Sequence, residues 1–260
     1  MQSKYNNTKF NKMERLYVPN RGHVVFEDVV FDEKLGAEIN QFLREYEHCD
    51  ILSKYNLPLS NKLLLHGKSG CGKTMTARAI ARKLGKKIKV INLGSIVSSK
   101  LGETSANIAS AFRLVESQEA VLFFDEFDSL GKERDYDNTD SSEMKRVVNT
   151  MLQLIDSLPK HSIIIAATNQ LDMIDSALLR RFELKLEFRN PSNDLLDSFY
   201  DKLLVKYPEE YRQIERKYDI SFAEAQDLIF RTVKNNIIVS ELSKKNSMVK
   251  ENKEADPCLN

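Results

Sequence analysis

The sequence predicts an α/β protein, a doubly wound parallel sheet followed by a small all-helical domain, and three observations support this. Strand-like stretches alternate with helical patterns along the first 190 residues, which is typical of a parallel sheet with crossover helices. Two of the stretches lack polar alternation, as expected of strands buried on both faces. After Pro191 the pattern is helical only. The strand candidates are Lys62–Leu65, Lys87–Leu93, Val121–Phe124, Ile163–Ala167 and Glu183–Phe188.

The elements follow in order from local signals. Ala77, Ile80 and Leu84 are spaced as on one helix face after the first strand, and Gly85 is a suitable stop. A longer helix is predicted over Ser141–Leu158, with Asp140 and Glu143 as a capping pair. The stretch Ala37–Tyr55 also has a helical pattern. Glu183–Phe188 alternates strictly, so it predicts a strand with one solvated face, at an edge.

Composition divides the chain into four parts. Residues 1–25 are polar and predict a flexible arm, and residues 26–190 hold the α/β domain. Residues 191–245 predict the helical domain, in which Ser221 and Glu224 form a capping box. Residues 246–260 are polar and predict a disordered tail.

The bulk composition excludes several classes of function. Lys plus Arg number 39 and Asp plus Glu number 38, so a net charge of +1 gives no support for nucleic acid or an acidic membrane as partner. No apolar run is long enough to span a bilayer, and the polar N-terminus has no secretory signal. Three scattered cysteines favour a reducing cytoplasm. The four histidines show no metal-ligand spacing, and the adjacent pair His48-Cys49 is interpreted as a chance surface neighbour.

The stretch Leu63–Thr74 carries the strongest chemical signal. Its spacing, Gly67, four residues, then Gly72-Lys73-Thr74, fits the phosphate-binding loop pattern between a strand and a helix. Glycines let backbone N–H groups turn inward around an anion, and the following helix directs its positive end to the same place. Lys73 would reach the β- and γ-phosphates of a nucleotide, and the Thr74 hydroxyl would ligate Mg²⁺. The predicted nucleotide-binding residues are Ser69, Gly70, Cys71, Gly72, Lys73, Thr74 and Met75.

Two carboxylates follow the buried strand Val121–Phe124. Asp125 lies where ligands gather in open α/β sheets and would complete the Mg²⁺ site with Thr74. Glu126 could polarise the attacking water as general base. A pair of solvated carboxylates at a strand end is the alternative, and the upstream phosphate loop argues against it.

Two further polar sites are candidates for catalysis. Asn169 ends the strand Ile163–Ala167 and could orient the water, although an Asn there is also common in ordinary turns. Arg180 and Arg181 follow a short helical stretch, and an arginine can neutralise the charge that develops in phosphoryl transfer. A solvated basic pair is the alternative, and spacing alone does not show whether either arginine faces its own nucleotide.

Over roughly residues 24–240 the sequence resembles the AAA family of ATPases, in particular short bacterial members without a separate N-terminal domain. The resemblance rests on an ordered set of motifs, GKSGCGKT, SSKLGETSANIASAF, VLFFDEFDSLGKERD, RVVNTMLQLIDSL, AATN and IDSALLRRFE. It implies a sheet of order 5-1-4-3-2 with a helical lid, and a homo-oligomeric ring, usually a hexamer, that uses Mg²⁺ and ATP to remodel proteins. It also implies that Lys73, Thr74 and Asp125 bind phosphate and metal, that Glu126 and Asn169 act on the water, and that Arg180 and Arg181 act on a neighbour's ATP.

The sequence departs from the family pattern in the phosphate-binding loop and in the segment where many members carry a pore loop. Lys68, Ser69 and Cys71 replace two prolines and a threonine, and binding should survive because the backbone makes the cradle. Lys100-Leu101-Gly102-Glu103 lacks the usual aromatic, so it would grip a polypeptide weakly. Two functions stay open: an ATP-driven remodeller, and a slow assembly switch for a partner, for which resemblance suggests a subtilisin-like protease.

Overall fold

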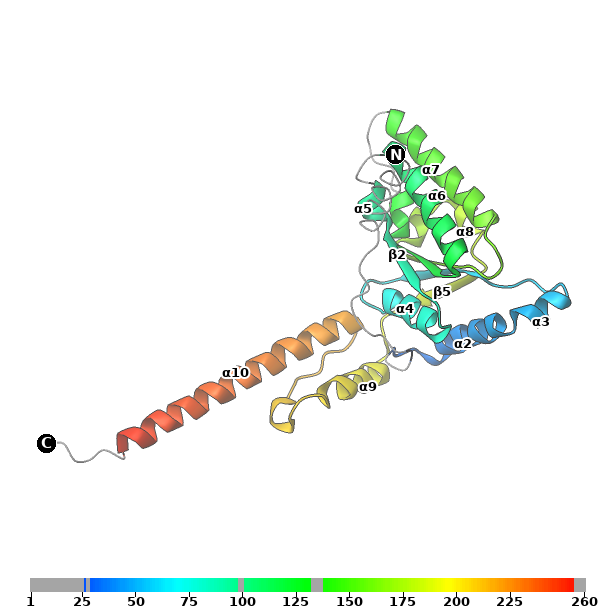
Figure 1. Cartoon of the computed structure of the whole chain (residues 1–260). Helices are drawn as coiled ribbons and strands as arrows, with labels where there is room; N and C mark the ends of the chain where they lie inside the picture. The colour runs from blue at the N-terminus through cyan, green and yellow to red at the C-terminus, as the bar shows by residue number, and fades with distance from the viewer. Residues whose placement is uncertain (1–25, 27–28, 98–100, 132–137, 255–260) are drawn as a thin grey trace, which may run out of the picture. The chain divides into compact units, whose positions relative to one another are not determined.

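The computed structural model describes residues 26, 29–97, 101–131 and 138–254, although the side chains of 96–97, 101–103, 118, 138–143 and 246–254 lie outside that description. The chain forms two units, residues 1–189 and residues 190–260. The first unit holds the whole sheet and the second holds the last helices (Figure 1).

Five parallel strands form one sheet in the order β2-β3-β4-β1-β5. This confirms the predicted topology, since 5-1-4-3-2 is the same order from the other edge. The strictly alternating strand β5 lies at an edge, as predicted. The strands are β1 (Lys62–Gly67), β2 (Ile88–Asn92), β3 (Val121–Asp125), β4 (Ile163–Thr168) and β5 (Leu184–Phe188).

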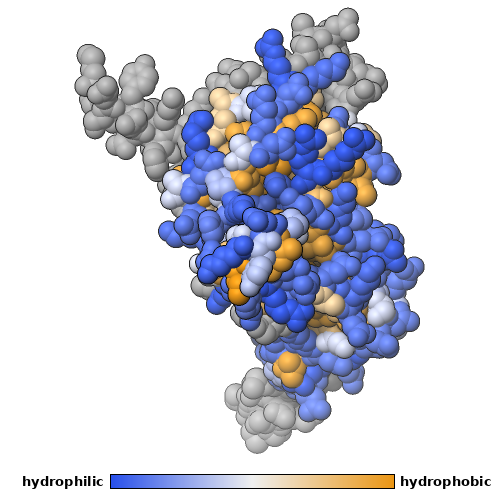
Figure 2. Space-filling model, turned by 90° about the vertical axis from the view of Figure 1, so that its right-hand side faces the viewer, coloured by the Kyte–Doolittle hydropathy of each residue, from blue (hydrophilic) through white to orange (hydrophobic). Residues whose placement is uncertain are grey.

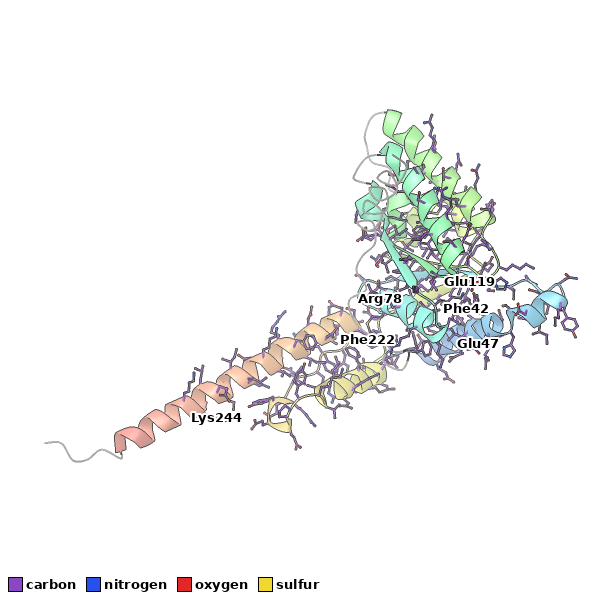
Figure 3. The ribbon with its side chains drawn as sticks, viewed as in Figure 1. Phe42, Glu47, Arg78, Glu119, Phe222 and Lys244 are labelled. Atoms are coloured by element: carbon purple, nitrogen blue, oxygen red, sulfur yellow. The ribbon has the colours of Figure 1, made fainter. Side chains whose placement is uncertain are left out.

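Helices cover both faces of the sheet and form two separate apolar cores (Figure 1). On one face α2 and α4 pack against alternate strand residues such as Leu63 and Phe123, and Phe42 of α2 belongs to this layer (Figure 3). On the other face α6, α7 and α8 pack against Leu64 and Phe124. The helices of this unit are α2 (Glu33–Glu47), α3 (Cys49–Lys54), α4 (Lys73–Lys83), α5 (Leu93–Val97), α6 (Leu101–Gln118), α7 (Asn138–Asp156) and α8 (Ser176–Leu179), with short 3₁₀ turns η2 (Phe127–Leu130) and η3 (Leu171–Met173).

Local signals explain the starts and ends of several helices. Gly85, with φ of 65°, follows α4 as the predicted stop. The predicted helix over Ala37–Tyr55 is instead two helices, because the chain leaves helical geometry at His48, whose φ is −106° and ψ 19°. The predicted capping pair Asp140 and Glu143 lies outside the described side chains.

The second unit is helical, with its own core. It contains α9 (Asn193–Leu204), the 3₁₀ turn η4 (Glu209–Tyr211) and α10 (Phe222–Glu254). Tyr200 is fully buried between these helices, and its hydroxyl donates to the Lys217 carbonyl at 3.1 Å. The predicted capping box is present, since the Ser221 N–H donates to Glu224 Oε2 at 2.8 Å and the Glu224 N–H donates to Ser221 Oγ at 3.3 Å.

The last helix is longer than the sequence suggested. The segment predicted as a disordered tail is helical as far as Glu254, because no glycine or proline interrupts the chain between Phe222 and that residue. Figure 3 shows Lys244 far along α10 from Phe222. Ile238, Val239 and Leu242 on this part of the helix are more than half exposed.

The surface view in Figure 2 is mostly hydrophilic, and apolar side chains appear in separate patches. Within the described residues, no helix combines the length and the apolar character needed to cross a bilayer.

Candidate active site at the carboxyl edge of the sheet

The loop between β1 and α4 is a tight turn that needs glycine. Gly67 and Gly72 have φ angles of 126° and 100°, which side chains other than glycine rarely adopt. A Cβ on Gly67 would lie 2.0 Å from the Phe188 carbonyl oxygen of β5, and the next residue, Lys68, donates its N–H to that oxygen at 3.1 Å. The loop is therefore fixed against the end of the edge strand.

Lys73 lies inside this loop and is 7% exposed. Its Nζ donates to the carbonyls of Gly67 and Lys68, at 2.7 Å each, and burial lowers its pKa. The first turn of α4 has no acidic residue and no side-chain cap on its backbone N–H groups. Lys73 begins this same turn, so the N–H groups and a buried ammonium belong to one short stretch of chain. This donor set fits a phosphate chain.

Thr74 and Asp125 meet across the gap between the first helical turn and the end of β3. The Thr74 hydroxyl donates to Asp125 Oδ2 at 3.1 Å. Burial raises the pKa of Asp125, and hydrogen bonds from the Glu126 N–H, at 3.0 Å, and from Thr74 oppose that rise. A hydroxyl and a carboxylate are hard oxygen ligands, so the pair fits Mg²⁺ bound with phosphate oxygens.

Glu126 follows with an unusual backbone. Its φ of 54° is in the left-handed region, which costs energy for a residue with a side chain and turns the chain sharply after β3. Its carboxylate lies against Gly94 at the start of α5, where an added Cβ would be 2.2 Å from Glu126 Oε2. Sequence reasoning did not identify Gly94, since no motif marks it and only the folded chain brings it to Glu126.

Asn169 is exposed directly after β4, so it lies at the same edge of the sheet as Asp125. The backbone here is held by Thr168, whose hydroxyl donates to Asp128 Oδ1 at 3.0 Å and accepts from the Gln170 N–H at 3.0 Å. Asp128 and Thr168 are both buried, and sequence reasoning assigned neither a role. They position the two polar segments that follow β3 and β4.

The arginines lie at the other end of the sheet. Both precede β5, whose first residue pairs with Leu63 at the start of β1, whereas the phosphate loop follows the end of β1. At roughly 3.3 Å per residue, the four steps from Leu63 to Gly67 separate these ends by about 13 Å. The structure therefore brings Lys73, Thr74, Asp125, Glu126 and Asn169 to one edge and leaves Arg180 and Arg181 away from it.

The two arginines differ from each other. Arg181 donates from Nε and from a terminal nitrogen to the two carboxylate oxygens of Asp156, at 3.1 Å each, and also to the Ala177 carbonyl at 3.1 Å. Arg180 is exposed, and within the described part of the chain no hydrogen bond or ion pair holds its guanidinium.

The other residues predicted to bind the nucleotide differ in exposure and in backbone conformation. Ser69 is exposed, Gly70 has a φ of 76°, and Met75 is 43% exposed on α4. Cys71 is buried, with its thiol directed to the Ser69 carbonyl at 3.7 Å. Lys100 lies outside the described residues, as do the side chains of the adjoining segment Leu101–Glu103, for which the resemblance predicted a place in a pore.

Comparison with known proteins agrees with this geometry. Residues 63–190 match the family described as ATPase family associated with various cellular activities (AAA). The chain belongs to the AAA family. It is 35% identical over 214 residues to an uncharacterized AAA family ATPase of Sinorhizobium fredii, covering 81% of this chain and 64% of that protein.

One further relative matches over a smaller part of its length, and one solved structure shows a similarity of fold alone. A 26S proteasome regulatory subunit 8 homolog of Schizosaccharomyces pombe is 33% identical over 169 residues, or 62% of this chain and 42% of the homolog. This AAA chain thus spans less than two thirds of the length of either relative. The FIGL-1 AAA domain in complex with ADP superposes with a TM-score of 0.70 at 21% identity, over 86% of this chain and 79% of that one.

Proposed function

We propose that this AAA protein hydrolyses ATP with Mg²⁺. The observation that carries the proposal is the contact between Thr74 and Asp125 beside the buried ammonium of Lys73, because it unites a phosphate site and a metal site. Mg²⁺, when bound there, would neutralise charge that develops on the transferring phosphoryl group. Thr74 and Asp125 would hold it, and Lys73 would exchange its loop carbonyls for phosphate oxygens.

In this proposal the other polar residues act on the water. Glu126 would accept the proton of the attacking water, and its sharp backbone turn and the small Gly94 beneath it would fix the carboxylate. Asn169 would orient the same water from the end of β4 with an uncharged amide. The buried hydrogen bond between Thr168 and Asp128 would hold the segment after β3 and the segment after β4 in fixed positions relative to each other.

We further propose that the protein works as a ring, usually of six subunits, in which arginines act on the ATP of a neighbour. The support is that Arg180 is exposed at the opposite end of the sheet from its own phosphate loop. A guanidinium at that end is far from the chain's own phosphate loop, which supports a role on a nucleotide held by another subunit. The family resemblance supplies the expectation of six.

The proposed target is a protein, and a protease, of the subtilisin type, is the proposed partner. Relatives named as proteasome regulatory subunit homologs support a link to protein turnover. We place the protein in the cytoplasm, because three scattered cysteines in the sequence are typical of a reducing compartment. ATP turnover that rises on adding an unfolded protein would support a remodeller. Turnover that stays slow while a partner binds only with ATP would favour the assembly switch.

The deciding experiment is ATP turnover per subunit across a range of protein concentrations. Specific activity should rise with concentration and fall to near zero when Arg180→Ala and Arg181→Ala are combined. Glu126→Gln is the matched control, because it should bind ATP and assemble normally but lose about 10²- to 10⁴-fold in turnover. High activity in a species that light scattering shows to be monomeric would contradict the ring.

A further inference from the structure

Three side chains with metal-binding atoms meet at the end of the sheet opposite the phosphate loop. Cys49 and Asp50 begin α3, and His161 lies in the connection from α7 to β4, more than a hundred residues later. The Cys49 sulfur lies 4.0 Å from His161 Nδ1 and 3.9 Å from Asp50 Oδ1. The three ligand atoms lie within 4.8 Å of one another.

The position of His161 is set by the fold. Asn61, which is 5% exposed just before β1, donates from its side-chain amide to the carbonyls of Pro159 and Ser162, at 3.2 and 2.9 Å. The Tyr46 hydroxyl of α2 donates to the carbonyl of His161 itself. The connection on which the imidazole sits is therefore anchored from both the sheet and α2.

The same contacts fix the other half of the cluster. Tyr46 lies one turn before Cys49, and its ring packs on Phe42 with centroids 6.2 Å apart, so this corner of α2 and α3 is tied to the sheet. Both halves are attached to the same unit of the fold. Asp50 and His161 are exposed and Cys49 is partly buried, so short side-chain movements are enough to bring the ligand atoms closer.

The chemistry of the trio selects a particular class of metal. A thiolate, an imidazole and a carboxylate are the donors that Zn²⁺ takes, whereas Mg²⁺ and Ca²⁺ prefer oxygen alone. Zinc bond lengths of about 2.0–2.3 Å in a tetrahedron place ligand atoms roughly 3.3–3.8 Å apart. The distances from the Cys49 sulfur are within a few tenths of an ångström of that range.

We propose that Cys49, Asp50 and His161 form a zinc site, with a fourth position taken by water. On binding, the Cys49 thiol releases its proton, and the thiolate, the carboxylate and the neutral imidazole together balance the 2+ charge of the ion. The ion would join the corner between α2 and α3 to the connection before β4. This site is separate from the proposed ATP and Mg²⁺ site, so either can exist without the other.

The test is a Co²⁺ titration of the nucleotide-free full chain, with excess Mg²⁺ present, followed by competition with Zn²⁺. Cobalt bound by a thiolate gives an intense charge-transfer band in the near ultraviolet, which oxygen ligands do not produce. We expect one Co²⁺ per chain, displaced by one Zn²⁺. Zn²⁺ should also raise the thermal unfolding midpoint of the wild-type protein by mass action.

Single variants assign the ligands. Cys49→Ser should abolish the band, and Asp50→Asn and His161→Gln should each weaken Co²⁺ binding at least tenfold and remove the thermal shift. Cys71→Ser, Cys258→Ser and His48→Gln are matched controls that should keep both signals. Unchanged circular dichroism with a chelator present would show that the variants are folded. The proposal is overturned by the absence of the band in wild-type protein, by its persistence in Cys49→Ser, or by an equal loss in His48→Gln.

Discussion

Arg181 and Asp156 form a two-point contact, with two guanidinium nitrogens each 3.1 Å from a different carboxylate oxygen. Its neighbour Arg180 has no such restraint among the described residues and is exposed. One arginine is thus tied to the end of α7, and the other can extend toward an adjacent molecule.

From this difference we predict unequal effects on ATP turnover. Arg180→Ala should lower kcat by about 10³-fold or more without changing stability, because it removes a group that neutralises transition-state charge. Arg181→Ala should lower turnover less, and Asp156→Ala should reproduce that smaller loss. Steady-state kinetics and thermal melts of the three variants measure this. If Arg181→Ala abolishes turnover while Arg180→Ala leaves it intact, the roles are reversed.

Gly94→Ala should lower ATP turnover without lowering the stability of the fold. The new methyl group would fall 2.2 Å from Glu126 Oε2, so the carboxylate must move, but it is the end of a flexible side chain and the fold can accommodate it. We expect turnover to fall at least about tenfold, ATP affinity to stay unchanged, and the free energy of unfolding to stay equal or to rise by up to about 1 kcal/mol, since alanine favours a helix.

The matched control for that prediction is Gly36→Ala in α2. Its added Cβ would lie 3.6 Å from the Cβ of Phe31, which is an ordinary contact. Turnover should be that of wild type. A Gly94→Ala protein as active as this control would show that the position of Glu126 is not critical.

Asp125→Asn should stabilise the nucleotide-free protein and inactivate it. Burial raises the pKa of Asp125, which means that the folded state disfavours the charged carboxylate relative to the unfolded state. Removing the charge should raise the thermal unfolding midpoint without ATP. Loss of a metal ligand should lower turnover by about 100-fold or more. A lower midpoint without ATP would show that the hydrogen bonds to Asp125 outweigh its desolvation.

Stability should depend on pH through His66. Burial lowers its pKa below the usual value near 6.5, Lys73 and Lys185 lower it further, and Glu187 opposes the change. Between the folded and unfolded pKa values the unfolded chain binds the proton and the folded chain does not. Stability should therefore be retained above pH 6.5 and fall as the pH decreases below it.

Urea unfolding at several pH values between 5 and 8 measures that effect. His66→Gln should reduce the loss of stability on acidification, whereas His48→Gln, at an exposed position, should not. Identical pH profiles for wild type and His66→Gln would refute the assignment.

The sequence predicted the strands of the sheet well, because buried strands and amphipathic helices leave periodic patterns. The strand order came from the resemblance to the AAA family and not from those patterns. It also predicted the edge position of β5 and the turn at Gly67, where backbone geometry demands glycine. The contacts of Arg181 with Asp156, Glu126 with Gly94, and Cys49 with His161 could not be predicted. Each joins residues far apart in the chain, and each depends on how side chains are directed after folding.

The length of α10 was misjudged for a related reason. Its polar second half has the composition of a tail, and composition indicated disorder where the absence of glycine and proline allows a helix. The capping box at Ser221, which is local, was predicted correctly.

Strand β5 has a consequence for the proposed ring. The arginines precede its first residue, and the carbonyl of Phe188 at its last position receives the N–H of Lys68. Five residues of stiff edge strand thus connect the place that would sense a neighbour's phosphate to the loop that would hold the chain's own. In the proposed ring, a displacement at the arginine end would reach the chain's own phosphate loop along the backbone of this strand, without a separate series of side-chain contacts.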